Sequence, residues 1–330
     1  MTVLRTALEA SLTDPRFVGD ELIPTLSVGT TAHLTSMRPR LAGPSDQDEV
    51  SAELSTPDGE LVFLTAFGRE EDAESTYRVL DALWTTGLGG GSRHRVPQPL
   101  AYMHDWWVVV TALPSGTPLS SLIDSRALQA PAAVKDAGAW LADLHASKVR
   151  IGSPWLPWRS ATTLADHLRP FPAKLAPSRN AMRRMLRALA PHASRSMPPT
   201  MVQTHGRFRD DRVLIRPDGV TVHDLSQSVP GDPARDVAEF LFHLRLRAFR
   251  IGDPRGEDLT SLFLDGYLEH APERHLTNLS YYVAFSILTS LARLIPRETP
   301  SDPGWGETVE FHLDEFDRLV VAETRTLMPA

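Results

Sequence analysis

The spacing of apolar residues changes once along the chain, and this change limits the folds open to it. Short segments, alternating or strongly apolar, fill the first part at 26–37, 49–56, 59–67 and 105–113. Such segments are typical of β-strands, and the pair Asp58-Gly59 predicts a hairpin turn between two of them. Residues 4–12 and 70–84 have apolar residues at helical spacing instead, which predicts two helices in this part.

Beyond residues 113–119 the helical spacing dominates. It recurs at 130–147, 160–168, 178–193, 233–249, 258–271, 279–295 and 307–327. One exception is a hairpin pattern at 212–224, with Asp218-Gly219 as its turn. We therefore expect an α+β protein with a small β-rich N-lobe at 1–113 and a larger helical C-lobe at 114–330. Ligands often bind in the cleft between two such lobes.

The composition excludes several classes of protein. The chain has no cysteine, so it has neither disulfides nor thiolate metal sites nor thiol catalysis. No run of 18 or more apolar residues is present, which argues against a membrane span, and the first residues do not resemble a secretory signal. A formal net charge of −7 disfavours general nucleic-acid binding. We expect a cytoplasmic protein with no nucleic-acid and no membrane partner.

Four motifs follow one another at 108–119, 139–147, 202–215 and 220–241. The third reads VQTHGRFRDDRVLI, and the fourth contains the run GDPARDVA. In this order and spacing they resemble the aminoglycoside phosphotransferase family of protein-kinase-like proteins, over about residues 25–295. The resemblance implies a two-lobed, protein-kinase-like fold of the aminoglycoside phosphotransferase type.

The third motif is similar to the catalytic loop of that family, whose usual form is H-G-D-x-x-x-x-N. On this alignment Arg207 stands in place of the catalytic Asp, and Arg212 stands in place of the Asn that binds Mg²⁺. A guanidinium stays protonated at any working pH, so it serves neither as a base nor as a metal ligand. The segment 205–214 is thus expected to be a degenerate catalytic loop, in which a shifted register would offer Asp211 as a substitute ligand.

The N-lobe lacks a third chemical group that the resemblance implies. The lysine that contacts phosphate is expected on the strand 59–67, where Thr65 takes its place and no lysine occurs. Its acidic partner on the next helix would be Glu74 or Thr76, and without the lysine we expect a solvated Glu74. The resemblance also implies a glycine-rich loop over the phosphates. It would fall at 26–34, where Gly29 is the only glycine.

Asp224, in the strand 220–226, is similar to the metal-binding Asp of the family. It is either a residual metal or nucleotide contact, or a structural Asp that binds the backbone of the catalytic loop. Asp224 and Asp211 are the two candidate metal ligands.

Four more polar residues are expected to have structural roles. Asp232, directly before a proline, and Asp236 are expected to cap the helix that follows. The resemblance implies that Asp236 braces the catalytic loop, through Arg207 or the region of His205. We expect His205 to be a structural member of the loop, and His145 to lie in the core.

The missing base, lysine and metal ligand favour a pseudokinase. Such a protein would act as a binding or scaffold subunit for a peptide, a small molecule or a partner protein, and would need no cofactor, although the resemblance keeps ATP and Mg²⁺ open.

Two other functions remain open from the sequence. One is a repurposed enzyme, such as a lyase or cyclase in peptide modification, by analogy with actinobacterial pathways in which such enzymes act after a kinase. It would bind an anionic or phosphorylated substrate in a cleft lined by His205, Arg207, Arg209, Asp211, Arg212 and Asp224. The other is an atypical active phosphotransferase that uses Asp211 and Asp224. Alternatively, the arginines simply form salt bridges with neighbouring aspartates.

Overall fold

The computed structural model describes residues 16, 22, 40–41, 49–55, 61–156, 176–193, 198, 200–297 and 304–327. The chain divides into two compact units. Unit 1 comprises Met1–Pro118 and Arg212–Ser228, and unit 2 comprises Leu119–Asp211 and Val229–Ala330. The segments predicted at 4–12, 26–37 and 160–168, the turn Asp58-Gly59 and Gly29 lie outside the described residues.

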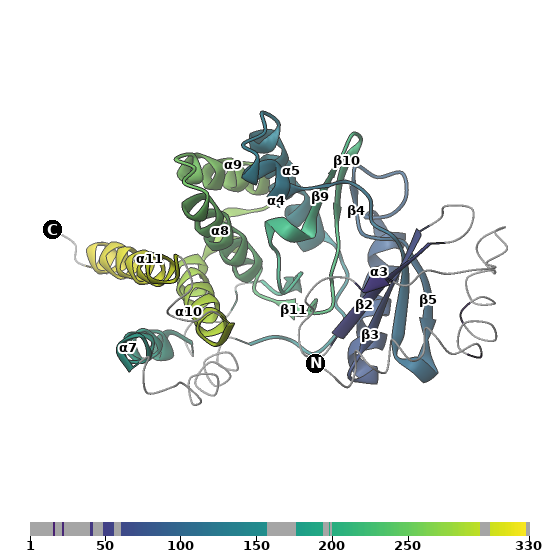
Figure 1. Ribbon diagram of the computed structural model, residues 1–330, viewed down its shortest axis with the longest axis horizontal. Helices are drawn as coiled ribbons and strands as arrows, with labels where there is room; N and C mark the ends of the chain where they lie inside the picture. Colours follow the sequence, from purple (N-terminus) through teal and green to yellow (C-terminus); the bar gives the residue numbers. More distant parts are fainter. Residues whose placement is uncertain are drawn as a thin grey trace. The chain divides into compact units, whose positions relative to one another are not determined.

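Unit 1 contains a five-stranded antiparallel sheet in the order β1-β2-β3-β6-β5, of which β2, β3 and β5 are labelled in Figure 1. Its strands are β1 (Arg40–Leu41), β2 (Glu49–Ser55), β3 (Leu61–Phe67), β5 (Pro99–Met103) and β6 (Val108–Ala112). Three of them confirm predicted strands, although β6 starts later than expected because His104–Trp106 forms a short 3₁₀ turn. Strand β5, a short strand that begins at a proline, was not predicted from the sequence.

Helix α3 (Glu70–Thr86) packs against β3, β5 and β6 of this sheet. Its buried residues share one face of the helix, at the i, i+3 and i+4 spacings expected for a buried stripe: Ala73, Thr76, Val79, Leu80 and Leu83. Three acidic residues in its first turn interact favourably with the positive end of the helix dipole. The predicted helix at 70–84 is confirmed.

The second sheet of unit 1 contains the predicted hairpin. Its order is β4 (His94–Arg95), β10 (Gly219–Val222), β9 (Val213–Arg216), β7 (Thr117–Pro118). The turn requires glycine at 219, because its φ is 146° and a Cβ there would lie 2.0 Å from the carbonyl oxygen of Arg93. The hairpin thus lies directly against the segment before β4.

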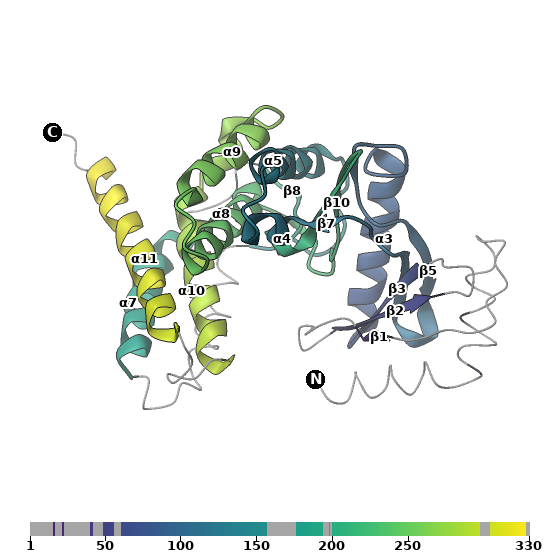
Figure 2. The same ribbon diagram turned by 45° about the horizontal axis from the view of Figure 1, so that its top comes forward.

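Unit 2 is mainly helical (Figure 2), and its described residues include one short antiparallel pair of strands. Its helices are α4 (Leu119–Asp124), α5 (Ala130–Ala146), α7 (Ala176–Ala193), α8 (Pro233–Arg250), α9 (Gly256–Leu268), α10 (Leu279–Arg297) and α11 (Trp305–Leu327). The paired strands are β8 (Val202–Gln203) and β11 (Pro230–Gly231). Six of these helices confirm predicted ones to within three residues. Among the described residues, no helix has the length and apolarity needed to cross a membrane.

A row of stacked, buried aromatic rings joins three helices of unit 2. Phe208 stacks on Trp140 of α5, with ring centroids 5.7 Å apart, and on Phe240 of α8 at 5.1 Å. Phe240 in turn stacks on Phe263 of α9 at 4.1 Å. All four side chains are fully buried. Phe208 therefore anchors the predicted catalytic loop to three helices.

Candidate functional site

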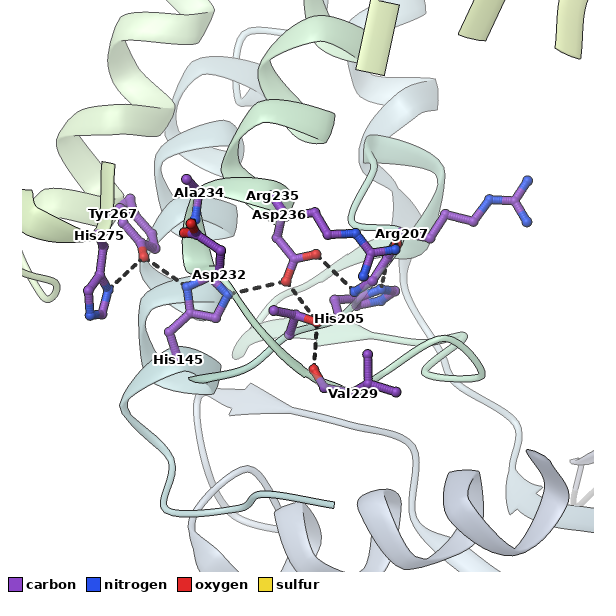
Figure 3. Close-up of polar contacts among 12 residues, drawn as sticks. His145, His205, Arg207, Val229, Asp232, Ala234, Arg235, Asp236, Tyr267 and His275 are labelled. Carbon is purple, nitrogen blue, oxygen red and sulfur yellow. Dashed lines mark hydrogen bonds and ion pairs between the residues drawn. The ribbon is translucent and has the colours of Figure 1, made fainter. Parts of the chain in front are cut away.

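Asp236 holds the start of the predicted catalytic loop in unit 2. Its Oδ2 accepts a hydrogen bond from the backbone N–H of His205 at 2.6 Å, and its Oδ1 accepts one from Gly206 N–H at 2.8 Å (Figure 3). The expected brace is therefore confirmed, and it is made to the loop backbone. Burial by itself would raise the pKa of Asp236, but the hydrogen bond and charge of His145, with His205 and Arg235, hold that pKa below its usual value. The brace is an ionised carboxylate.

A buried chain of polar side chains continues behind Asp236. His145 Nε2 lies 3.2 Å from Asp236 Oδ2, and His145 Nδ1 lies 2.8 Å from Tyr267 Oη (Figure 3). Tyr267 Oη also lies 3.0 Å from His275 Nδ1. Burial, followed by His145 and Arg274, lowers the pKa of His275 to about 4, so this ring is neutral at pH 7.

The ionised Asp236 sets the direction of the first of these hydrogen bonds. Its carboxylate only accepts, so His145 Nε2–H donates to it. The Tyr267 hydroxyl carries one proton, so it donates to only one of its two histidine neighbours and can accept from the other. His145 is thus a fully hydrogen-bonded core residue, as predicted.

Asp232 caps α8 as the sequence predicts, whereas the capping role expected of Asp236 is wrong, because both of its oxygens accept from the loop backbone. Its Oδ1 accepts from Ala234 N–H at 3.0 Å, and its Oδ2 accepts from the Asn278 side chain at 2.7 Å. The proline at the first helical position needs no such partner. Because Asn278 directly precedes α10, the cap also ties α8 to that helix.

The ring of His205 is enclosed by the core. It is fully buried, and it contacts the rings of Trp140 and Phe208 edge-on, with centroids 6.4 Å and 5.6 Å away. Its Nδ1 lies 3.4 Å from the backbone N–H of Arg207, which donates to it. These contacts give His205 a packing role in the loop.

The loop borders a pocket of about 440 Å³ within unit 2. Five arginines from the loop, α8 and α10 line it: Arg207, Arg209, Arg247, Arg250 and Arg293. Three aspartates are also present in the lining: Asp124, Asp210 and Asp211.

Ion pairs join some of these arginines to the aspartates. Arg209 Nε lies 3.5 Å from Asp211 Oδ1, and Arg247 pairs with both the buried Asp210 and, at 3.0 Å, Asp124. Burial raises the pKa of Asp210, and the charge of Arg247 opposes this rise. Asp211, a candidate metal ligand, therefore faces a guanidinium. The described residues contain no group of three or more His, Asp or Glu side chains that could hold a metal ion.

In unit 1 the candidate metal ligand Asp224 is engaged on both oxygens. Arg212 Nε forms an ion pair with its Oδ2 at 2.9 Å, and the Ser226 hydroxyl donates to its Oδ1 at 2.9 Å. Its backbone has a φ of 66°, a left-handed conformation that Asp adopts more readily than most residues. Arg212 and Asp224 thus form a local, partly buried pair next to the β9–β10 hairpin.

Thr65 lies in the middle of β3, also in unit 1. It is half-buried between the buried Leu64 and Ala66, and its strand pairs with β2 and β6 on either side. Threonine brings no charge to this position. Glu74 pairs with Arg78 at 3.7 Å, and both side chains are more than half exposed, which confirms a solvated Glu74.

Three of the pocket arginines, Arg247, Arg250 and Arg293, were not predicted from the sequence, and neither was the pair Tyr267–His275. A signal was present on α8, where His243, Arg247 and Arg250 follow a spacing of four and three residues and therefore share one helix face. The sequence offers no comparable signal for Arg293, which reaches the pocket from α10.

Several solved structures share the fold of this chain. An amicoumacin kinase in complex with AMP-PNP has a TM-score of 0.63 at 11% identity, over 95% of this chain and 96% of that one. Spectinomycin phosphotransferase has a TM-score of 0.59 at 13% identity, over 90% and 93%. A macrolide 2′-phosphotransferase from Brachybacterium faecium has a TM-score of 0.52 at 17% identity, over 89% and 98%.

No curated protein sequence matches the chain. The model of the phosphotransferase enzyme family, by contrast, matches residues 42–276, well over half of the chain. The protein therefore belongs to the phosphotransferase enzyme family and has the α+β, two-lobed, protein-kinase-like fold of the aminoglycoside phosphotransferase type.

Proposed function

We propose that this chain is a catalytically degenerate member of its family, a pseudokinase that acts as a binding or scaffold subunit for a peptide, a metabolite or a partner enzyme. The ion pair between Arg212 and Asp224, at 2.9 Å, carries this proposal. On the alignment both residues stand at metal-binding positions. A permanent cation therefore pairs with the carboxylate that would otherwise hold Mg²⁺.

Two further positions support the proposal. Arg207 stands at the place of the base and cannot accept a proton, and Thr65 stands at the place of the phosphate lysine without its charge. Phosphoryl transfer relies on positioning and on electrostatic stabilisation of the phosphates. A positioned base alone contributes roughly 10²–10⁴-fold in rate. These losses together disfavour catalysis, and we propose that the protein requires neither ATP nor Mg²⁺.

The test combines nucleotide binding with turnover. The purified chain is incubated with ATP or GTP, Mg²⁺ and alcohol substrates such as spectinomycin, a macrolide and choline, and release of ADP or GDP is measured. We expect no phosphorylated product and no Mg²⁺-dependent rise in melting temperature at millimolar nucleotide. The variant Arg212→Asn is expected to gain Mg²⁺-dependent nucleotide binding. It frees Asp224 from its cation, so a Mg²⁺-dependent thermal shift is expected in this variant.

One outcome would contradict the proposal. A phosphorylated product formed by the wild-type chain and lost in Asp224→Asn would establish an atypical active phosphotransferase. Arg184→Gln, an exposed change on α7, is the matched control for loss of one arginine and should behave as wild type in both assays.

The second candidate is the repurposed enzyme, and the arginine-rich pocket of unit 2 is the observation that favours it. Such an enzyme would release inorganic phosphate from a phosphoserine peptide without any nucleotide. Detection of that release by the wild-type chain would favour this candidate over the pseudokinase.

A further inference from the structure

The pocket of unit 2 concentrates positive charge in an acidic protein. The whole chain has a formal net charge of −7, yet the five arginines and three aspartates of the pocket lining give +2 with histidine neutral. Gathering like charges in one place is unfavourable by Coulomb's law, and an anion bound among them would relieve the repulsion. The pocket is therefore suited to a negatively charged ligand.

Guanidinium groups from separate elements converge at this pocket. Arg209 comes from the loop and Arg293 from α10, and both act on the same carboxylate, Glu239 of α8. Burial by itself would raise the pKa of Glu239, but His243, Arg209 and Arg293 hold it well below its usual value. Two arginines far apart in the chain thus lie within electrostatic reach of one point.

The existing ion pairs indicate how much negative charge a ligand needs in order to bind in this pocket. Arg247 is held by Asp124 and Asp210, whereas the Arg209–Asp211 contact is long at 3.5 Å. A ligand must therefore compete with Asp211 for Arg209, and with the buried Glu239 for both Arg209 and Arg293. A doubly charged oxyanion does so better than a second carboxylate, because guanidinium forks match phosphate geometry and the attraction grows with charge.

We propose that this pocket binds the dianionic phosphate group of a phosphorylated small molecule or side chain, with Arg209 and Arg293 as its main donors. The pocket volume of about 440 Å³ exceeds that of a phosphate group alone and falls in the usual range for small-molecule sites. Leu246, Ile251 and Leu294 also line it, and they offer apolar surface to the carbon part of such a ligand. The inference depends only on unit 2 and holds whether or not the chain transfers phosphate.

Calorimetric titration of the full chain tests this site without nucleotide or metal. The probes are O-phosphoserine, a pentapeptide of phosphoserine flanked by alanines, and inorganic phosphate. Serine, which lacks the phosphate group, is the control. We expect saturable binding of a phosphorylated probe, no binding of serine, and weaker binding at higher salt. Tighter binding of the peptide than of phosphoserine would identify a side chain as the source of the phosphate, and the reverse order would identify a small molecule.

Variants locate the binding. Arg293→Gln and Arg209→Gln should each raise Kd at least about tenfold, equivalent to about 1.4 kcal/mol. Arg293→Lys keeps the charge without the fork and should give an intermediate Kd. Arg184→Gln on the exposed face of α7 should leave Kd within about twofold of wild type. The half-buried Arg293 provides a second variant if Arg209→Gln does not fold, as judged by its melting temperature.

Two results would overturn the inference. One is the absence of saturable binding for all three phosphorylated probes up to about 10 mM, since weaker binding than this is not specific. The other is binding that Arg184→Gln weakens as much as Arg293→Gln does, which would indicate nonspecific attraction to surface arginines. Neither result bears on the Arg212–Asp224 pair, so failure here is distinguishable from failure of the pseudokinase proposal.

Discussion

Replacing Asp236 with asparagine should destabilise the loop although it preserves the size of the side chain. An amide has one acceptor oxygen, whereas the two loop N–H groups use different oxygens of the carboxylate. His205 N donates to Oδ2 and Gly206 N to Oδ1, at 2.6 Å and 2.8 Å. In either orientation of the introduced amide, therefore, its NH₂ group faces one backbone N–H.

The preferred orientation of the introduced amide can be derived from the same contacts. With its oxygen in the place of Oδ2, it keeps the hydrogen bonds from His205 N and His145 Nε2 and loses only that from Gly206 N. The lost bond is one to a charged acceptor, worth about 1.5–3 kcal/mol, and a buried N–H without an acceptor adds a penalty of its own. We expect the free energy of unfolding to fall by about 2–4 kcal/mol.

Urea unfolding and hydrogen exchange together measure this effect. The first gives the loss of stability, and the second should show faster exchange of the amides at 205 and 206. Asp317→Asn, an exposed change on α11, is the control and should alter stability by less than about 0.5 kcal/mol. A loss below about 1 kcal/mol for Asp236→Asn, with unchanged exchange in the loop, would refute the reasoning.

Three further changes test the core of unit 2. Gly138→Ala would place a Cβ 2.2 Å from the carbonyl oxygen of Phe263, so the free energy of unfolding in urea should fall by about 1–3 kcal/mol. The control Gly306→Ala meets no atom within 4 Å and should leave the free energy of unfolding unchanged. Tyr267→Phe removes the hydroxyl that bridges two buried histidines, and thermal unfolding should show a loss of about 1–3 kcal/mol; an unchanged melting temperature would contradict the chain of hydrogen bonds. Burial lowers the pKa of His312 to about 4, so the folded state binds fewer protons than the unfolded state between pH 6.5 and 4. Stability should therefore fall as pH drops through this window, by about 3 kcal/mol from this group, and His312→Gln should remove that part of the slope in urea titrations at each pH.

Elements with strong local signals could be predicted from the sequence. The Asp232–Pro233 start of α8 is one, because a side-chain cap and a proline act on the same helical turn. Strand β5 could not be predicted in this way, since a five-residue run that begins with a proline has little intrinsic preference for a strand. Its pairing with β6 determines its conformation, and pairing is a tertiary effect.

The candidate site shows the same division between local and tertiary effects. Arg212 and Asp224 flank the predicted hairpin, so an ion pair between them was among the sequence-based alternatives. The arginine pocket depends instead on how α8 and α10 pack, and Arg293 belongs to it only because these two helices are in contact. No spacing in the sequence encodes that contact.

The way in which the loop of unit 2 is held in place bears on the proposed function. Asp236 and Phe208 fix the loop by a buried ionised carboxylate and by aromatic stacking. A buried charge is an expensive way to fix a segment, and apolar packing of similar volume is often the more stable arrangement. A brace of this kind is therefore expected where the function depends on the exact position of the loop. In this chain the brace positions Arg207 and Arg209 at the edge of the pocket. The proposed binding at that pocket needs a fixed loop but neither base nor metal, and a buried brace of this kind meets that need.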